Sequence, residues 1–219
     1  MSTSPPNAPR IAVLDYGAGN LRSVARALVR SGLDPEITSS PAAVRGADAV
    51  VLPGVGAFKD AAENLRAKGL SEAVCEFIAS GRPYLGLCLG LQVLFEESDE
   101  HGRTPGLGLL PGRVERFPGR LASGQPLRVP HIGWNEVEWS GGHPVLSKLP
   151  ARDCYYFVHS YRAVPADPDV IVGRTEYGGQ FAAAVARDNV FAVQFHPEKS
   201  QSAGLRLLDG FAAWVASCA

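Results

Sequence analysis

The chain has 219 residues, enough for one sizeable hydrophobic core, and its 46% apolar and 20% charged residues are typical of a globular protein. Its formal net charge of -1, from 21 basic and 22 acidic side chains, gives no electrostatic attraction toward nucleic acid or an anionic membrane. No stretch approaches the ~18 consecutive apolar residues that a membrane-spanning helix needs.

The first half of the chain alternates apolar strands with amphipathic helices. Residues 1–9 lack the basic and apolar segments of a signal peptide, so we expect a short disordered tail there. Strands are expected at 11–15, 36–38, 47–52 and 83–87. Helices are expected over 21–30 (ended by Gly32), 57–68, 70–80 and after Cys88. This alternation predicts a mostly parallel sheet covered by helices on both faces.

From about residue 110 the pattern changes to short segments rich in Val, Tyr, Phe and Trp, separated by Pro and Gly. We expect these segments to form hairpins and antiparallel additions at the sheet edge, with a final helix over residues 201–217. No repeat or linker divides the chain. The prediction is therefore a single α/β domain over residues 10–219, with three layers and a mixed, mostly parallel sheet between helices.

The segment G-L-C-L-G at 86–90 places Cys88 where a parallel strand is expected to end, the edge at which open α/β sheets hold their sites. Glycines on both sides permit a sharp turn, as G-x-S-x-G does in hydrolases. A helix amino terminus favours a thiolate, and the N–H of Leu89 would point at an oxyanion. Cys88 is thus a candidate nucleophile, and a buried structural cysteine is the alternative.

The remaining cysteines lack this context, and we interpret all three as structural: Cys75, Cys154 and Cys218. With no C-x-x-C pair among the four, the sequence predicts a reducing, cytoplasmic setting, without a disulfide framework or a metal site.

His196 is the candidate proton carrier among five histidines. It ends a strongly apolar segment, and in extended backbone Glu198, two residues later, projects to the same side and can orient the imidazole. His101 lies in a charged loop that looks like a solvated turn, His143 is also a loop residue, and both are interpreted as having no catalytic role. The order Cys…His…Glu differs from that of α/β-hydrolases, which weakens a hydrolase interpretation.

Together, G-L-C-L-G-L-Q and the distant H-P-E resemble the signature of the class I (triad) glutamine amidotransferases, over nearly the whole chain. The resemblance implies their flavodoxin-like fold and attack of Cys88 on the side-chain carboxamide of L-glutamine, with His196 and Glu198 completing the triad. It implies no cofactor and no metal. The implied oxyanion N–H groups come from Leu89 and the Gly54–Val55 stretch, and the implied substrate contacts are Gly54, Gln92, Ser160 and Tyr161.

Five further motifs are similar to one branch of that family. They are Y-G-A-G-N at 16–20, P-G-V-G-A-F at 53–58, P-H-I-G-W-N at 130–135, Y-F-V-H-S-Y at 156–161 and H-P-E-K-S at 196–200. In that branch the glutaminase forms a heterodimer with a separate (β/α)8-barrel cyclase subunit that receives ammonia through a channel. The resemblance implies that Asn20, Trp134 and Lys199 face this partner, with Trp134 close to the ammonia exit.

Two other functions remain open from the residues. One is a triad glutaminase that feeds another acceptor, such as anthranilate, a purine or pyridoxal phosphate; P-G-V-G-A-F with P-H-I-G-W-N disfavours it. The other is a redox sensor that uses Cys88, which H-P-E disfavours because a sensor needs no histidine–carboxylate pair. Nucleotide binding is not predicted, since Y-G-A-G-N lacks both the dinucleotide-loop spacing and a P-loop lysine.

Overall fold

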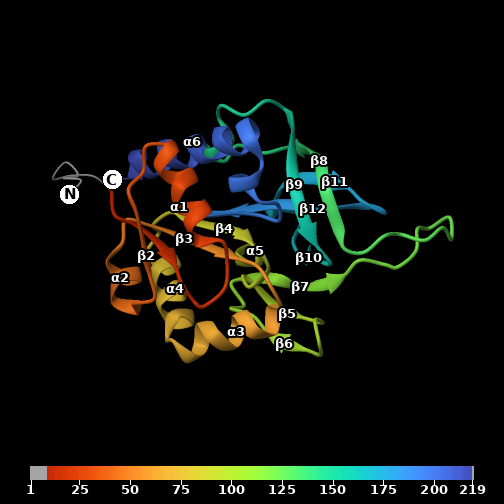
Figure 1. The fold of residues 1–219 in the computed structure, drawn as a ribbon, viewed down its shortest axis with the longest axis horizontal. Helices are drawn as coiled ribbons and strands as arrows, with labels where there is room; N and C mark the ends of the chain where they lie inside the picture. Colours follow the sequence, from red (N-terminus) through yellow and green to blue (C-terminus); the bar gives the residue numbers. More distant parts are fainter. Residues whose placement is uncertain (1–8, 219) are drawn as a thin grey trace.

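The structure is a computed structural model that describes residues 9–218, in which two sheets and six α-helices are arranged as in Figure 1. The larger sheet contains β1 (Ile11–Leu14), β2 (Pro35–Thr38), β3 (Ala49–Gly54), β4 (Tyr84–Cys88), β8 (His131–Trp139), β9 (Arg152–His159), β11 (Ile171–Glu176), β12 (Gln180–Arg187) and β13 (Val190–Val193). Its order is β2-β1-β3-β4-β13-β12-β11-β8-β9. The five strands from β2 to β13 pair in parallel and the others pair antiparallel. The predicted α/β class with a mixed sheet is confirmed.

Helices cover both faces of this sheet. One face carries α1 (Leu21–Arg30) and α6 (Gln201–Cys218), and the other carries α2 (Pro41–Gly46), α3 (Phe58–Ala67) and α4 (Leu70–Ala79) (Figure 1). The two faces of β1 enter separate cores: Ile11 and Val13 pack with α1 and α6, while Ala12 and Leu14 pack with the helices opposite. Burial on both faces explains why these strands read as continuous apolar runs.

A second, four-stranded sheet is the main departure from the sequence-based expectation. It has the order β10-β7-β5-β6 and contains β5 (Phe95–Ser98), β6 (Thr104–Pro105), β7 (Leu110–Arg116) and β10 (Tyr161–Pro165). Leu110, Val114 and Ala163 join the same core as α3 and α4. The apolar segment 154–161, expected as one addition to the main sheet, is divided at Ser160 between β9 and β10.

The helix expected after Cys88 is a single turn, α5 (Leu89–Gln92), which is followed at once by β5. Leu91, Val93, Leu94 and Phe95 are all buried, with exposed fractions of 1% or less. The segment runs between α3, the main sheet and the small sheet, so apolar residues are needed on every side. The run of apolar residues after Cys88 therefore reflects burial on several sides and not a long helix.

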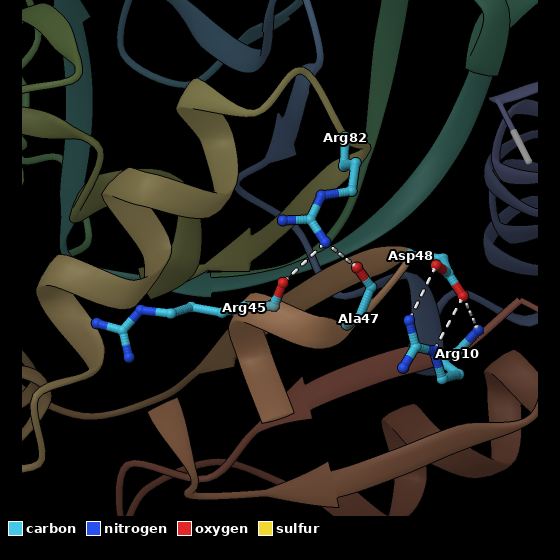
Figure 2. A network of polar contacts seen from close by, with 5 residues as sticks. All are labelled: Arg10, Arg45, Ala47, Asp48 and Arg82. Carbon is cyan, nitrogen blue, oxygen red and sulfur yellow. Dashed lines mark hydrogen bonds and ion pairs between the residues drawn. The ribbon is translucent and has the colours of Figure 1, made fainter. Parts of the chain in front are cut away.

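Polar contacts hold the amino ends of the parallel strands, away from Cys88 (Figure 2). Arg82, before β4, donates from Nη1 to the carbonyl oxygens of Arg45 (2.9 Å) and Ala47, which lie at the end of α2. Asp48 accepts a hydrogen bond of 2.8 Å from the backbone N–H of Arg10, and its pKa is lowered by that bond first and by the Arg10 guanidinium. Arg82 thus satisfies carbonyls that the end of α2 leaves free.

Short 3₁₀ turns complete the described elements: η1 (Pro144–Leu146), η2 (Pro168–Val170) and η3 (Pro197–Lys199).

Within residues 9–218 no helix has the length and apolar character needed to cross a membrane. Those same residues contain no group of three or more His, Cys, Asp or Glu side chains placed to hold a metal ion. The tail expected over 1–9 lies, apart from Pro9, outside the described residues. The single domain over 10–219 stays a prediction.

Candidate active site

Cys88 occupies the sharp turn that the glycines predicted. It is the last residue of β4, has φ 53° and ψ −101°, and is 6% exposed. A positive φ is strained for a residue with a Cβ. The chain folds so tightly that a Cβ at Gly86 would lie 2.5 Å from the carbonyl oxygen of Gly90, and a Cβ at Gly90 would lie 1.8 Å from that of Leu52. Both glycines are required for close backbone contact around the cysteine.

Gly90→Ala is expected to lower the unfolding free energy by about 3 kcal/mol or more, because overpacking against backbone cannot be relieved by a side-chain movement. In a chain of this size that corresponds to a Tm about 6–12 °C lower in thermal unfolding. Gly142→Ala is the matched control: nothing lies within 4 Å of a Cβ there, so its effect is expected within about 0.5 kcal/mol of zero. Equal Tm values for the two variants would contradict this account of the turn.

His196 and Glu198 form a buried pair. His196 Nδ1 lies 2.8 Å from Glu198 Oε1, and the two side chains are 3% and 2% exposed. The geometry differs from the extended arrangement expected, because Glu198 lies in η3, a 3₁₀ turn. The turn is held by hydrogen bonds from the His196 N–H to the Tyr156 carbonyl (2.9 Å) and from Ser200 Oγ to the His196 carbonyl (2.6 Å).

Opposing effects set the protonation of His196. Burial lowers its pKa, but hydrogen bonding and charge from Cys88 and Glu198 outweigh this and raise the pKa to about 9. The ring is therefore protonated at neutral pH, the state that can donate a proton to a leaving group. Among the described residues, His196 Nε2 has no aligned hydrogen-bond partner. Catalytic hydrogen bonds are often poorly aligned before substrate binds.

A cavity of about 500 Å³ opens at Cys88. Several residues named from the sequence line it: Val55, Cys88, Leu89, Gln92, Ser160, Tyr161 and Lys199. Sequence reasoning did not single out the others: Gly56, Glu100, Pro130, Val158 and His159. The candidate residues from β4, α5 and the β9–β10 connection thus meet in one place.

Gly54 lies directly beside the nucleophile, because β3 and β4 pair with Gly54 opposite Cys88. A Cβ at Gly54 would lie 2.3 Å from the Tyr16 hydroxyl oxygen and 2.7 Å from Leu89 Cβ. Tyr16 is 1% exposed, and burial raises the pKa of its hydroxyl. The next residue, Val55, is 38% exposed. The Gly54–Val55 stretch therefore lies against Leu89, the other predicted source of an oxyanion N–H.

Gln92 lines the cavity and is linked to Cys88 by a series of hydrogen bonds. Its Nε2 donates to the carbonyl oxygen of Tyr161 (3.0 Å) and to Gln194 Oε1 (3.1 Å), and Gln194 Nε2 donates to Cys88 Sγ (3.6 Å). Among the described residues none donates to Gln92 Oε1, so this side chain offers the cavity an acceptor. Gln194 is fully buried and was missed; its signal is a polar residue in the apolar run before H-P-E.

Glu100 was also missed, because E-E-S-D-E-H reads as a solvated turn. Its Oε2 accepts a hydrogen bond of 2.6 Å from the Phe58 N–H, and the residue lines the cavity. His143 lies in a loop, as the sequence indicates. Its ring packs against Phe191 and Trp214, its Nδ1 accepts from the Val145 N–H (3.3 Å), and burial lowers its pKa to about 4. His101 is exposed.

Two of the three residues expected to face a partner lie together. Trp134 is 49% exposed and packs edge-on against Tyr156, with ring centroids 6.2 Å apart, while Lys199 Nζ lies 5.9 Å from the centroid of the same Tyr156 ring. Asn20 is exposed at the start of α1. Lys199 also lines the cavity, so this surface adjoins the site.

A cysteine on a tight strand–helix turn, a buried His–Glu pair and a doubly covered mixed sheet define a protein of the triad amidotransferase class. The sequence model of the family described as "Glutamine amidotransferase class-I" matches residues 12–213. Among solved structures, PurLQS from Thermotoga maritima has a TM-score of 0.73 at 18% identity, covering 95% of this chain and 99% of that one. At this identity the likeness shows the fold alone.

Two relatives narrow the assignment. Imidazole glycerol phosphate synthase subunit HisH from Syntrophotalea carbinolica is 50% identical over 202 residues, covering 92% of this chain and 98% of the relative. The same subunit from Methylococcus capsulatus is 51% identical over 209 residues, covering 93% and 96%. The chain belongs to the class-I glutamine amidotransferases and, among them, to the HisH subunits of imidazole glycerol phosphate synthase.

Proposed function

We propose that this chain hydrolyses L-glutamine to glutamate and ammonia through a cysteine glutamyl thioester, and supplies the ammonia for histidine biosynthesis. The observation that carries the proposal is the placement of Cys88 on a strained turn at the cavity, beside a His196 whose pKa is raised to about 9 and which is paired with Glu198.

The mechanism follows from these groups. The Cys88 sulfur attacks the carboxamide carbon of glutamine, and the oxyanion accepts hydrogen bonds from the N–H of Leu89 and an N–H of the Gly54–Val55 stretch. The His196 imidazolium donates a proton to the departing ammonia, leaving the thioester and a neutral imidazole. His196 then takes a proton from water as the resulting hydroxide attacks the thioester, so glutamate and the Cys88 sulfur are released.

Acceptors in the cavity suit the amino-acid end of the substrate. Gln92 Oε1 is free to accept, because the Gln92 amide nitrogen donates to two protein oxygens, and the Glu100 carboxylate lies in the same cavity. Both complement the α-ammonium group of glutamine, which carries donors only. Ser160 and Tyr161 are proposed to hold the substrate through backbone groups, and Gly54 to approach it closely.

A second chain is part of the proposal, since ammonia released into water becomes ammonium, which is not a nucleophile. The proposed partner is a (β/α)8-barrel cyclase subunit, forming a heterodimer and producing imidazole glycerol phosphate and an aminoimidazole carboxamide ribotide. Its docking face would include Asn20, Trp134 and Lys199. Exposed apolar side chains on β8, Trp134 and the 59% exposed Ile132, support this placement. The proposed setting is the cytoplasm, with no cofactor.

Covalent labelling tests the proposal. The glutamine analogue 6-diazo-5-oxo-norleucine is expected to modify Cys88 and leave Cys75, Cys154 and Cys218 unlabelled, because the reagent must occupy the glutamine cavity first. Peptide mass spectrometry of the complex with its cyclase subunit and acceptor substrate locates the label. Excess glutamine should protect Cys88, and Cys88→Ser should not be labelled. A label on another cysteine, or none at all, would overturn the assignment.

A further inference from the structure

His131 and His159 form a buried pair that the proposed reaction steps do not use. They lie opposite each other in the β8–β9 ladder and are 3% and 7% exposed. His131 Nδ1 lies 3.1 Å from His159 Nε2, and His159 Nδ1 lies 2.8 Å from the carbonyl oxygen of Tyr161. That same carbonyl accepts the hydrogen bond from Gln92 Nε2. The pair therefore ends at the backbone group that positions a proposed glutamine contact.

The hydrogen bonds fix where the protons are. A carbonyl oxygen only accepts, so His159 must carry its proton on Nδ1. In a neutral ring His159 Nε2 is then an acceptor, and His131 must donate to it from Nδ1. His131 Nε2 in turn faces Asn135 Nδ2, a donor, at 3.4 Å. In this series of three hydrogen bonds each donor therefore points the same way, from Asn135 on β8 toward the Tyr161 carbonyl.

Asn135 anchors the far end in one orientation. Its Nδ2 also donates to the Glu176 carbonyl (2.9 Å), and its Oδ1 accepts from the N–H of Glu136 (2.9 Å). An inverted amide would place acceptor against acceptor and donor against donor, so the amide cannot turn without breaking both bonds. The fixed Asn135 amide on β8 thus sets the donor-to-acceptor direction of the whole series of hydrogen bonds.

The surroundings keep both rings neutral and in place. The His131 ring is stacked between Tyr177 (ring centroids 3.9 Å apart) and Phe157 (4.8 Å), and Phe117 lies edge-on to both histidines. Burial lowers the pKa of His131 to about 4 and is the main cause that lowers the pKa of His159 to about 3. A proton added to either ring would turn an acceptor nitrogen into a donor facing a donor.

We infer that His131 and His159 are positioning residues. With Asn135 they form a hydrogen-bonded relay of fixed direction that holds the Tyr161 carbonyl in place, and this carbonyl in turn holds the Gln92 side chain in the position that glutamine binding requires. This inference rests on the proposed glutamine site. Among the described residues no hydrogen bond joins either ring directly to the Cys88 sulfur or to the His196 imidazole; the path to the sulfur runs on through Gln92 and Gln194. The relay therefore acts chiefly on substrate binding and leaves bond breaking to the triad. Chains of aligned hydrogen bonds polarise one another, which strengthens the hold on the terminal carbonyl.

The direct test is the tautomer of each ring. Long-range ¹H–¹⁵N spectra of the full chain at neutral pH, assigned with His131→Asn and His159→Asn, are expected to show both histidines as neutral Nδ1–H tautomers. This result is independent of any enzymatic activity. An Nε2–H tautomer or an imidazolium at either position would overturn the relay.

Kinetics in the complex with the cyclase subunit tests the positioning role. His131→Phe keeps an aromatic ring for stacking but cannot donate, so KM for glutamine is expected to rise about 5- to 10-fold while kcat stays within about twofold. His131→Asn places an amide donor near the position of Nδ1 and should recover part of the loss. His143→Phe, the same change at another ring-packed histidine, is the control and should leave KM unchanged.

These outcomes separate the two proposals. If the wild-type complex does not hydrolyse glutamine, the proposed function fails, and the spectra still decide whether the relay exists. If the wild type is active and His131→Phe leaves KM for glutamine unchanged, the positioning role is wrong and the proposed function stands.

Discussion

Replacing Cys88 with alanine is expected to lower glutamine-dependent synthesis by at least ~10³-fold, to the background rate, because no other group at the cavity can form the thioester. Cys75, Cys154 and Cys218 lie on α4, β9 and the end of α6, away from the β4 turn. The same variant should leave synthesis from added ammonium salts unchanged, since the proposed cyclase subunit performs that step.

Both activities are measured on one preparation of the complex, with product formation followed from glutamine and then from ammonium. Cys88→Ser is the matched variant: it keeps a polar side chain of similar size on the strained turn and should show the same pattern. Loss of the ammonium-dependent reaction in the two variants would mean that Cys88 supports the complex as a whole, and the division of labour proposed between the two chains would be wrong.

Glu198→Gln is expected to reduce kcat for glutamine hydrolysis on the order of 10²–10⁴-fold, because the imidazole loses its charge partner and an amide, which can present either its oxygen or its NH₂ group, no longer fixes the proton on Nδ1. In the wild type, burial lowers the pKa of His196, and Cys88 and Glu198 raise it further than burial lowers it, to about 9. Without the carboxylate the pKa must fall. The alkaline limb of the kcat profile should therefore move to lower pH.

Stability gives a second measurement of the same pair. The folded-state pKa of His196, about 9, exceeds the unfolded value of about 6.5, so its contribution to the unfolding free energy is complete below about pH 6.5 and is lost as pH rises through 9. Glu198→Gln should flatten this dependence in denaturant titrations between pH 6 and 10. A variant with wild-type kcat and an unshifted profile would remove Glu198 from the proposed triad.

The sequence was most informative where the backbone has little choice. Close packing around Gly86 and Gly90 leaves room for no other residue, so G-x-C-x-G identified the turn at Cys88. It was least informative where tertiary packing decides: the run 91–95 looks helical, but the small sheet and α3 enclose it, and only one helical turn forms.

The rest of the site was hidden for a related reason. Glu100 lies in a run of charges that reads as a solvated turn, and only the fold brings its carboxylate to the cavity. Gln194 meets Gln92 and Cys88, and His131 meets His159, across more than twenty residues of sequence, so no local pattern shows which atoms they meet. Long-range hydrogen bonds are set by topology, which one sequence does not display.

The division of the chain at Ser160 has a mechanical consequence. β9 ends at His159 in the nine-stranded sheet, and β10 begins at Tyr161 in the four-stranded one; the chain makes a similar crossing from Cys88 at the end of β4 to Phe95 at the start of β5. The cavity therefore lies at the boundary between the two sheets, and its walls belong to two separately hydrogen-bonded sheets. A small movement of one sheet against the other would change the width of the cavity at Cys88 while the hydrogen bonds between strands within each sheet stayed intact.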